Sequence, residues 1–156
     1  MKKYEFTGEV KVKFGVTLKR IRALIDFGNV KKGELGGFIE KEENLSYAGD
    51  AWVSGNAWVY GNAWVSGDAE VSGNARVSGD ADYMVIGPIG SRFGFTTFFK
   101  NKNNKISVSC GCFLGTLAEF RAAVREKHGT DTKFAKVYQV AADLAELQIE
   151  HIEKAD

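Results

Sequence analysis

Cysteine and long apolar runs are what this sequence of 156 residues most clearly lacks. Its two cysteines are too few for the disulfide framework of a small secreted protein. No segment approaches the run of about 18 apolar residues that a membrane-spanning helix needs, and the opening MKKYEFTGEV has charged residues where a signal peptide is apolar. The net charge of +1 argues against a dedicated nucleic-acid-binding protein. We therefore expect a soluble, cytoplasmic protein that uses neither a membrane nor specific DNA binding.

Histidine is equally scarce, and this limits the enzymes that the chain could be. The only histidines are His128 and His151, whereas the zinc site of a β-helical carbonic anhydrase needs three. Acyltransferases built from hexapeptide repeats use a histidine on the coil as general base, and the repeat of this chain contains none. His128 is better explained by its position at the C-terminal end of a predicted helix, where a cation is favourable. We therefore predict no enzymatic activity, no catalytic residue, no metal and no cofactor.

The two cysteines could be half of a metal site or simply packed side chains. Cys110 and Cys112 are two residues apart in a predicted strand and would face the same side of it. Such a pair could supply half of a metal site, but the sequence has no second pair of cysteines or histidines in register. The favoured interpretation is that both are small residues packed in a hairpin.

What the sequence does contain is a six-residue repeat between residues 47 and 81. The successive units read YAGDAW, VSGNAW, VYGNAW, VSGDAE, VSGNAR and VSGDAD. Such a period is typical of a β-helix, in which each unit forms one side of a triangular coil and three units complete a turn. We predict that the valines and alanines point into the narrow interior and that the glycines mark the corners. The Asn or Asp after each glycine also tolerates a left-handed backbone.

Three tryptophans occupy outward positions of the repeat. Because every third unit returns to the same side, Trp52 is predicted to stack against Glu70 and Trp58 against Arg76, while Trp64 lies on the third side. Burial of each ring would contribute roughly 2 to 3 kcal/mol, so something should cover them. Either the flanking segments cover two faces and a neighbouring subunit covers the third, or a tryptophan serves as a stacking platform for a base or sugar ring.

The segments around the repeat predict a mainly β molecule in three parts. Residues 1–44 form an N-terminal β cap with a hairpin, and residues 45–86 form the short hexapeptide β-helix. Residues 87–156 form a C-terminal α+β subdomain with a hairpin and two helices. Because the coil is short, every residue lies near one of its two open ends. Caps and association of subunits are therefore expected to supply much of the burial.

Two helices are predicted near the C-terminus. The first begins with a capping box, in which Thr116 and Glu119 satisfy free amides, and ends at Gly129. The second is predicted over residues 131–152 by its apolar periodicity. Its predicted buried residues are Phe134, Val137, Tyr138, Ala141 and Leu144.

The run TLKRIRALIDFGNVKKGELGGFIEKEENLS followed by GNAWV units resembles a group of uncharacterised proteins that are common in bacterial phages and prophages. The likeness extends to the later strings YMVIGPIGSRFGFTTFF and SCGCF, and so covers most of the chain. It implies a left-handed hexapeptide β-helix. It also implies a phage-encoded protein of the host cytosol, assembled as a homotrimer because such helices usually associate around a threefold axis.

The stretch most suggestive of recognition is GPIGSRFGFTT, residues 87–97. Its glycines allow backbone amides to point at an anion, Ser91 adds a hydroxyl, and Arg92 can donate two hydrogen bonds to a phosphate or carboxylate. The alternative is a tight turn whose arginine pairs with an acidic residue of the coil such as Glu70. The predicted ligand-binding residues combine this stretch with the tryptophans: Gly90, Ser91, Arg92, Phe95, Thr96, Thr97, Trp52, Trp58 and Trp64.

Two functional hypotheses of different classes follow from these features. The first is a non-enzymatic phage protein that sequesters a small anionic ligand, such as a cyclic or signalling nucleotide of host immunity, at the junctions of a homotrimer or larger homo-oligomer. The second is a protein-interaction inhibitor that grips a host defence protein with its tryptophan faces. A structural component of the phage is a further alternative.

Overall fold

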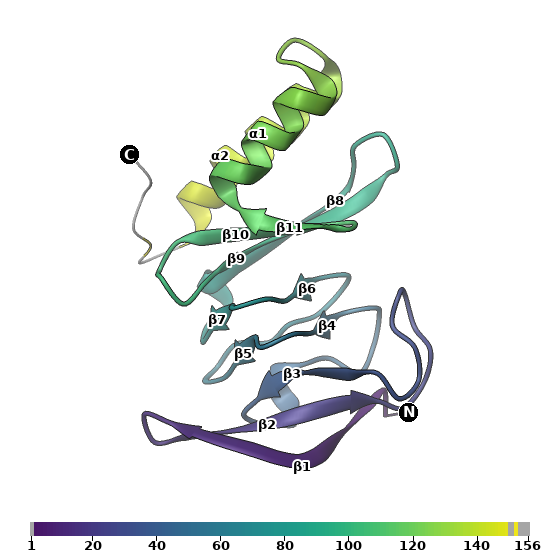
Figure 1. The fold of residues 1–156 in the computed structure, drawn as a ribbon, viewed down its shortest axis with the longest axis vertical. Coiled ribbons are helices and arrows are strands. Elements are labelled where there is room, and N and C mark those ends of the chain that lie inside the picture. The colour runs from purple at the N-terminus through teal and green to yellow at the C-terminus, as the bar shows by residue number, and fades with distance from the viewer. Residues whose placement is uncertain (1, 150–151, 153–156) are drawn as a thin grey trace. The chain divides into compact units, whose positions relative to one another are not determined.

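A computed structural model of the chain describes residues 2–149 and 152. This described part of the chain is mainly β and contains two α-helices (Figure 1). Its internal contacts divide it into two compact units, Met1–Asp80 and Ala81–Asp156. The division falls before the predicted boundary after residue 86, because the segment that follows Asp82 pairs with the second unit's sheet instead of ending the coil.

The repeat of the first unit forms parallel rungs. Strands β4 (Trp52–Val53) and β6 (Glu70–Val71) pair in parallel, and so do β5 (Trp58–Val59) and β7 (Arg76–Val77). Trp52 lies opposite Glu70 and Trp58 opposite Arg76, which confirms the predicted stacking. A parallel bridge between Leu45 and Val65 forms a third row of paired backbone.

The interior of this coil is filled by the small residues that the repeat supplies. All five repeat valines are fully buried, and so are the alanines at the fifth position of each unit before Ala81. Ala81 is only half-buried, because the period ends there in a short 3-10 turn, η2 (Asp80–Asp82). The buried positions are Val53, Val59, Val65, Val71, Val77, Ala51, Ala57, Ala63, Ala69 and Ala75.

The corners of the coil depend on glycine itself. Gly55, Gly61, Gly67 and Gly73 have φ between 60° and 67°, whereas the Asn or Asp that follows each of them does not have a positive φ. At Gly61 a Cβ would also lie 2.7 Å from the Ser78 carbonyl oxygen of the next coil. The sequence-based expectation that Asn or Asp would share the left-handed position was therefore wrong, because glycine bears the strain at no steric cost.

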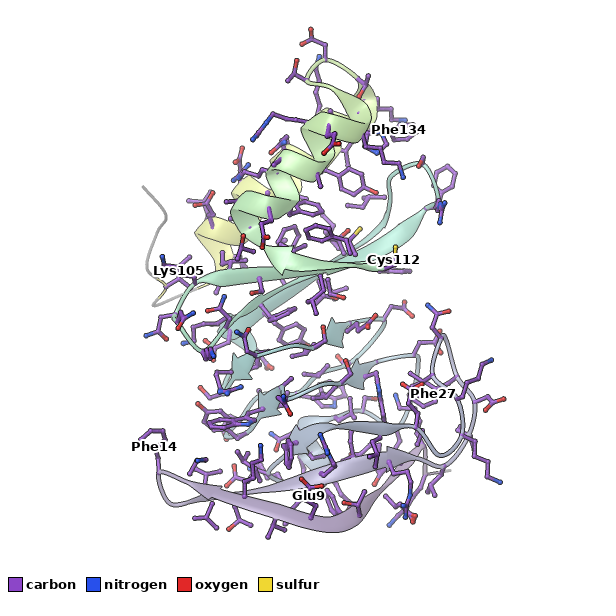
Figure 2. All side chains as sticks on the ribbon, in the orientation of Figure 1. Glu9, Phe14, Phe27, Lys105, Cys112 and Phe134 are labelled. Atoms are coloured by element: carbon purple, nitrogen blue, oxygen red, sulfur yellow. The ribbon has the colours of Figure 1, made fainter. Side chains whose placement is uncertain are left out.

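An N-terminal hairpin extends one face of the coil. Strands β1 (Tyr4–Lys13) and β2 (Val16–Ala23) are antiparallel, and their turn places both Phe14 and Gly15 at positive φ, as a tight hairpin requires. β2 pairs with β3 (Leu35–Ile39), which gives the sheet order β1-β2-β3-β5-β7. Figure 2 shows Phe14 at the tip of this hairpin.

Buried polar groups fasten this hairpin to the coil. The Lys3 ammonium donates to the Ala51 carbonyl at 2.7 Å, and burial lowers the pKa of Lys3 to about 8. The Tyr4 hydroxyl donates to the Leu45 carbonyl at 3.0 Å, and the Tyr4 ring stacks on Tyr47. The Lys3 ammonium and the Tyr4 hydroxyl are both paired, which avoids the large desolvation cost of an unpaired buried polar group.

Asn44 closes the entry to the coil. It belongs to the 3-10 helix η1 (Glu42–Asn44) and is fully buried. Its amide oxygen accepts from the backbone amides of Glu40 and Lys41, and its amide nitrogen donates to the carbonyls of Gly61 and Ala63. The side chain thus replaces backbone pairing where no strand is present.

The second unit is a four-stranded antiparallel sheet with two helices. Its strands are β8 (Tyr83–Ile89), β9 (Gly94–Lys100), β10 (Ile106–Cys110) and β11 (Phe113–Thr116), in the order β11-β10-β9-β8. Asp82, predicted to point outward from the coil, is instead buried and forms an ion pair with Lys100 at 3.2 Å.

The helices follow the predicted capping, and the predicted core of the second helix is confirmed in part. α1 (Leu117–His128) begins with the Thr116–Glu119 capping box and ends at Gly129, as expected. α2 (Lys133–Gln148) is shorter than predicted, and residues 150, 151 and 153–156 lie outside the described part of the chain. Of its predicted core, Ala141 is buried, Phe134, Val137 and Tyr138 are half-buried, and Leu144 is exposed. The buried residues of α2 are all alanines: Ala135, Ala141, Ala142 and Ala145.

Candidate functional site

The GSRF segment forms the turn between β8 and β9. The turn is closed by a hydrogen bond from the Phe93 amide to the Gly90 carbonyl at 3.2 Å. Gly90 has a φ of 82°, and a Cβ there would lie 1.8 Å from the Tyr138 hydroxyl oxygen. Only glycine fits, because the backbone passes directly against the Tyr138 ring of α2.

The side chains of this turn point to solvent. Ser91 and Arg92 are exposed, and Arg92 forms no ion pair with any residue among 2–149 and 152. Phe93 is 74% exposed and has a φ of 51°, which is unusual for a bulky residue, and Phe95 is 40% exposed. The turn therefore presents a hydroxyl and a guanidinium next to two accessible aromatic rings. We name the segment Gly90–Phe95 the arginine turn.

Thr96 and Thr97 do not share this exposure. Both are buried, and the Thr96 hydroxyl lies 3.2 Å from the Cys110 sulfur on the neighbouring strand. Unlike Ser91 and Arg92, these two predicted ligand-binding residues lie inside strand β9. The Thr96 hydroxyl thus contacts a neighbouring strand of the same unit.

The three tryptophans of the first unit differ in their surroundings. Trp52 is 2% exposed and meets the Phe27 ring edge-on at 5.3 Å. Trp58 is half-buried under the Arg76 guanidinium, whose carbon lies 3.5 Å from the ring centre. Trp64 is 53% exposed. Of the three tryptophans predicted as ligand contacts, Trp52 is therefore the one whose ring the chain's own residues bury.

Arg76 illustrates how the repeat covers one of its own aromatic faces. It follows Trp58 by one complete turn of the coil, lies over the ring and donates to the Asn56 and Ala75 carbonyls. Cation–π contacts of this kind contribute about 0.5 to 2 kcal/mol. Trp58 is thus occupied by an intramolecular partner, and Trp64 keeps the most accessible indole of the three.

Tyr138 is a residue of the site region that sequence reasoning placed only in the helix core. Its hydroxyl interacts with Cys110, and burial is the main cause that raises the Tyr138 pKa. Its ring stacks with His128 at 5.9 Å between centres and packs edge-on against Phe120. The helical spacing indicated burial of Tyr138, but nothing in the sequence pattern indicated that it supports the turn at Gly90.

The cysteines are arranged differently from the prediction. Cys110 ends β10, whereas Cys112 lies in the following turn, where Gly111 has a φ of 59° (Figure 2). They therefore do not lie on one strand facing the same side. Within residues 2–149 and 152, no three His, Cys, Asp or Glu side chains are grouped so that they could hold a metal ion.

Comparison with known proteins assigns no family or function to this chain. A scan against protein-family models and a search of curated proteins both give no match to this chain. In the described residues, neither helix has the length and apolar character needed to span a bilayer.

Proposed function

We propose that this protein is a non-enzymatic binding protein that takes up a small anionic ring compound, such as a cyclic or signalling nucleotide, at the arginine turn. The observation that carries the proposal is the accessible, ion-pair-free Arg92 beside Ser91, Phe93 and Phe95. A guanidinium can donate two parallel hydrogen bonds to a phosphate, and a phenyl ring can stack on a base. Gly90 supports this role because its contact with Tyr138 holds the base of the turn.

The resemblance described above and the repeat support a biological setting for this binding. We infer a phage-encoded protein of the host cytosol that sequesters a nucleotide immune signal. We further infer that the coil is a left-handed hexapeptide β-helix and that it assembles as a homotrimer, with the ligand held at subunit junctions. The parallel pairing of every third hexapeptide unit supports the coil, and the exposed Trp64 supports an interface on its third side.

Native mass spectrometry of protein purified from cells supplied with cyclic mono- and dinucleotides tests this proposal. We expect an oligomer that carries extra mass equal to bound nucleotide, and we expect Arg92→Ala to lose that mass without loss of fold. Lys102→Ala is the matched control, because Lys102 is another exposed cation on a loop of the same unit. A bare oligomer, or equal retention by Arg92→Ala, would contradict binding at the arginine turn.

The second candidate is an inhibitor that grips a host defence protein, and the exposure of Trp64 favours it over a purely structural role. Aromatic residues are enriched at the energetically dominant positions of interfaces. A pull-down from host lysate should then depend on Trp64 but not on Arg92. Long assemblies in solution would instead favour a structural component of the phage.

A further inference from the structure

Helix α2 has a second apolar face that stays exposed among the described residues, 2–149 and 152. Its buried side is made of alanines together with Ile149, which follows the helix. On the other side, Val140 is 64% exposed, Leu144 43% and Leu147 78%, and Val137 is half-buried next to them. We name Val137, Val140, Leu144 and Leu147 the α2 stripe. Three large, exposed apolar side chains in a row on one helix are more than the scattered surface residues of a monomer.

The spacing of the α2 stripe is that of a coiled-coil seam. The intervals of three, four and three residues between its members place all four on one narrow strip of the helix. The first two positions of the strip are valines and the last two are leucines. The stripe therefore matches itself when a second copy runs in the opposite direction.

The charges of α2 favour that opposite direction. Lys133 and Lys136 lie in its first half, and Asp143 and Glu146 lie in its second half. This order is unfavourable within a single helix, because the N-terminal end of a helix attracts negative charge and the C-terminal end attracts positive charge. In an antiparallel pair, the basic half of each helix lies beside the acidic half of the other.

The neighbouring helix strengthens this polarity. Arg125 and Lys127 lie in the last turn of α1, which connects to the basic end of α2 through a short loop. At the other end, Arg121 binds both Asp143, at 2.9 Å, and Glu146, at 2.5 Å, so two carboxylates share one cation. With Glu126 and Asp131 also counted at the first end and Glu119 at the second, one end of the helix pair keeps an excess of basic groups and the other an excess of acid.

We infer that α2 is a self-association surface, on which the stripes of two copies pack as an antiparallel, twofold-symmetric helix pair. Val137 then packs against Leu147 of the second copy, and Val140 against Leu144, each pair occurring twice. Because the same patch serves both copies, the contact closes at two and every assembly that uses it contains an even number of chains, so two homotrimers joined through it form a hexamer. This association does not depend on a ligand at the arginine turn.

Analytical ultracentrifugation of the full chain tests the surface. We expect wild-type protein to sediment as an even-numbered assembly, and Leu144→Glu to weaken that association about 30-fold or more, as loss of a central interface contact does. Val12→Glu is the control, because Val12 is similarly exposed but lies on β1 of the other unit. Circular dichroism should show both variants folded. A wild-type monomer, an odd-numbered assembly, or equal effects of both variants would overturn the inference.

Disulfide trapping tests the direction of the pairing. In a background with Cys110→Ser and Cys112→Ser, Val137→Cys and Leu147→Cys are prepared separately. An antiparallel pair brings position 137 of one copy to position 147 of the other, while equivalent positions stay about 15 Å apart along the axis. A mixture of the two variants should therefore crosslink under mild oxidation and neither variant alone should. Crosslinking of each variant with itself would overturn the antiparallel arrangement.

Discussion

At the scale of single residues, each interior position of the coil limits the size of the side chain that it accepts. The Val65 side chain is fully buried, and its backbone bridges to Leu45 and donates to the Asn44 carbonyl. At the corners the limit is stricter, since Gly61 would bring a Cβ to within 2.7 Å of a carbonyl oxygen of the next coil. Such close packing leaves no room for water to solvate a polar substituent.

Val65→Asp is therefore expected to abolish folding of the first unit, because it buries an unpaired carboxylate in the coil. Far-ultraviolet circular dichroism and thermal melting measure the outcome. Asn62→Asp serves as control, since it adds the same charge at an exposed corner position of the same coil. Melting of Val65→Asp like the wild-type protein would show that this position is not an interior one.

At the scale of elements, two hairpin turns place different residues at positive φ. The β1–β2 turn uses Phe14 and Gly15 at positive φ, and the β8–β9 turn uses Gly90 and Phe93. The second turn is further restricted by Tyr138, so that its conformation depends on a helix that is distant in sequence. The arginine turn is thus positioned by packing as well as by its own residues.

Gly90→Ala should destabilise the second unit by about 1 to 3 kcal/mol, because the new methyl group meets the Tyr138 ring and φ is positive. Urea unfolding measures this change. Gly94→Ala is the matched control, as a Cβ at Gly94 meets nothing within 4 Å and its φ is not positive. If both variants lose the same stability, the contact with Tyr138 does not support the turn.

Helix α1 begins with a capping box that was predicted from the sequence. Thr116 accepts from the Glu119 amide at 3.1 Å, and the Thr116 amide donates to the Glu119 carboxylate at 2.9 Å. This hydrogen bonding also lowers the Glu119 pKa. The pattern was readable in the sequence because all its partners lie within one helical turn.

At the scale of the whole molecule, buried ionisable groups couple stability to pH. Burial holds the Lys3 pKa at about 8, against 10.5 for a free lysine. Burial also raises the Tyr4 pKa above that of an ordinary tyrosine. Between pH 8 and 10.5 the unfolded chain keeps a proton on Lys3 that the folded chain has lost. Above about pH 10, the unfolded chain loses a proton from Tyr4 that the folded chain keeps.

The free energy of unfolding should therefore rise with pH from about 8 to about 10, with a slope of at most about 1.4 kcal/mol per pH unit from Lys3. It should fall at higher pH, where Tyr4 contributes with the opposite sign. Urea unfolding across this range measures the profile. In Lys3→Met the rise should disappear, although the variant also loses the hydrogen bond to Ala51. A rise that persists in Lys3→Met would assign it to another group.

The sequence by itself determined the features whose partners are set by spacing along the chain. The six-residue period predicts the parallel pairing with Glu70 and Arg76 and the burial of the valines and alanines. The cap at Thr116 follows from residues within a single helical turn. These features need no knowledge of distant segments, because each repeats or closes locally.

Only the tertiary structure decided which of these side chains remain accessible. Trp52 is covered by Phe27, Trp58 by Arg76, and Thr96 by the interior of a sheet, while Arg92 and Leu144 reach solvent. The same residue type is buried in one case and exposed in another because coverage depends on contacts between segments far apart in the chain. Periodicity indicates the direction of a side chain, and only packing shows what it meets.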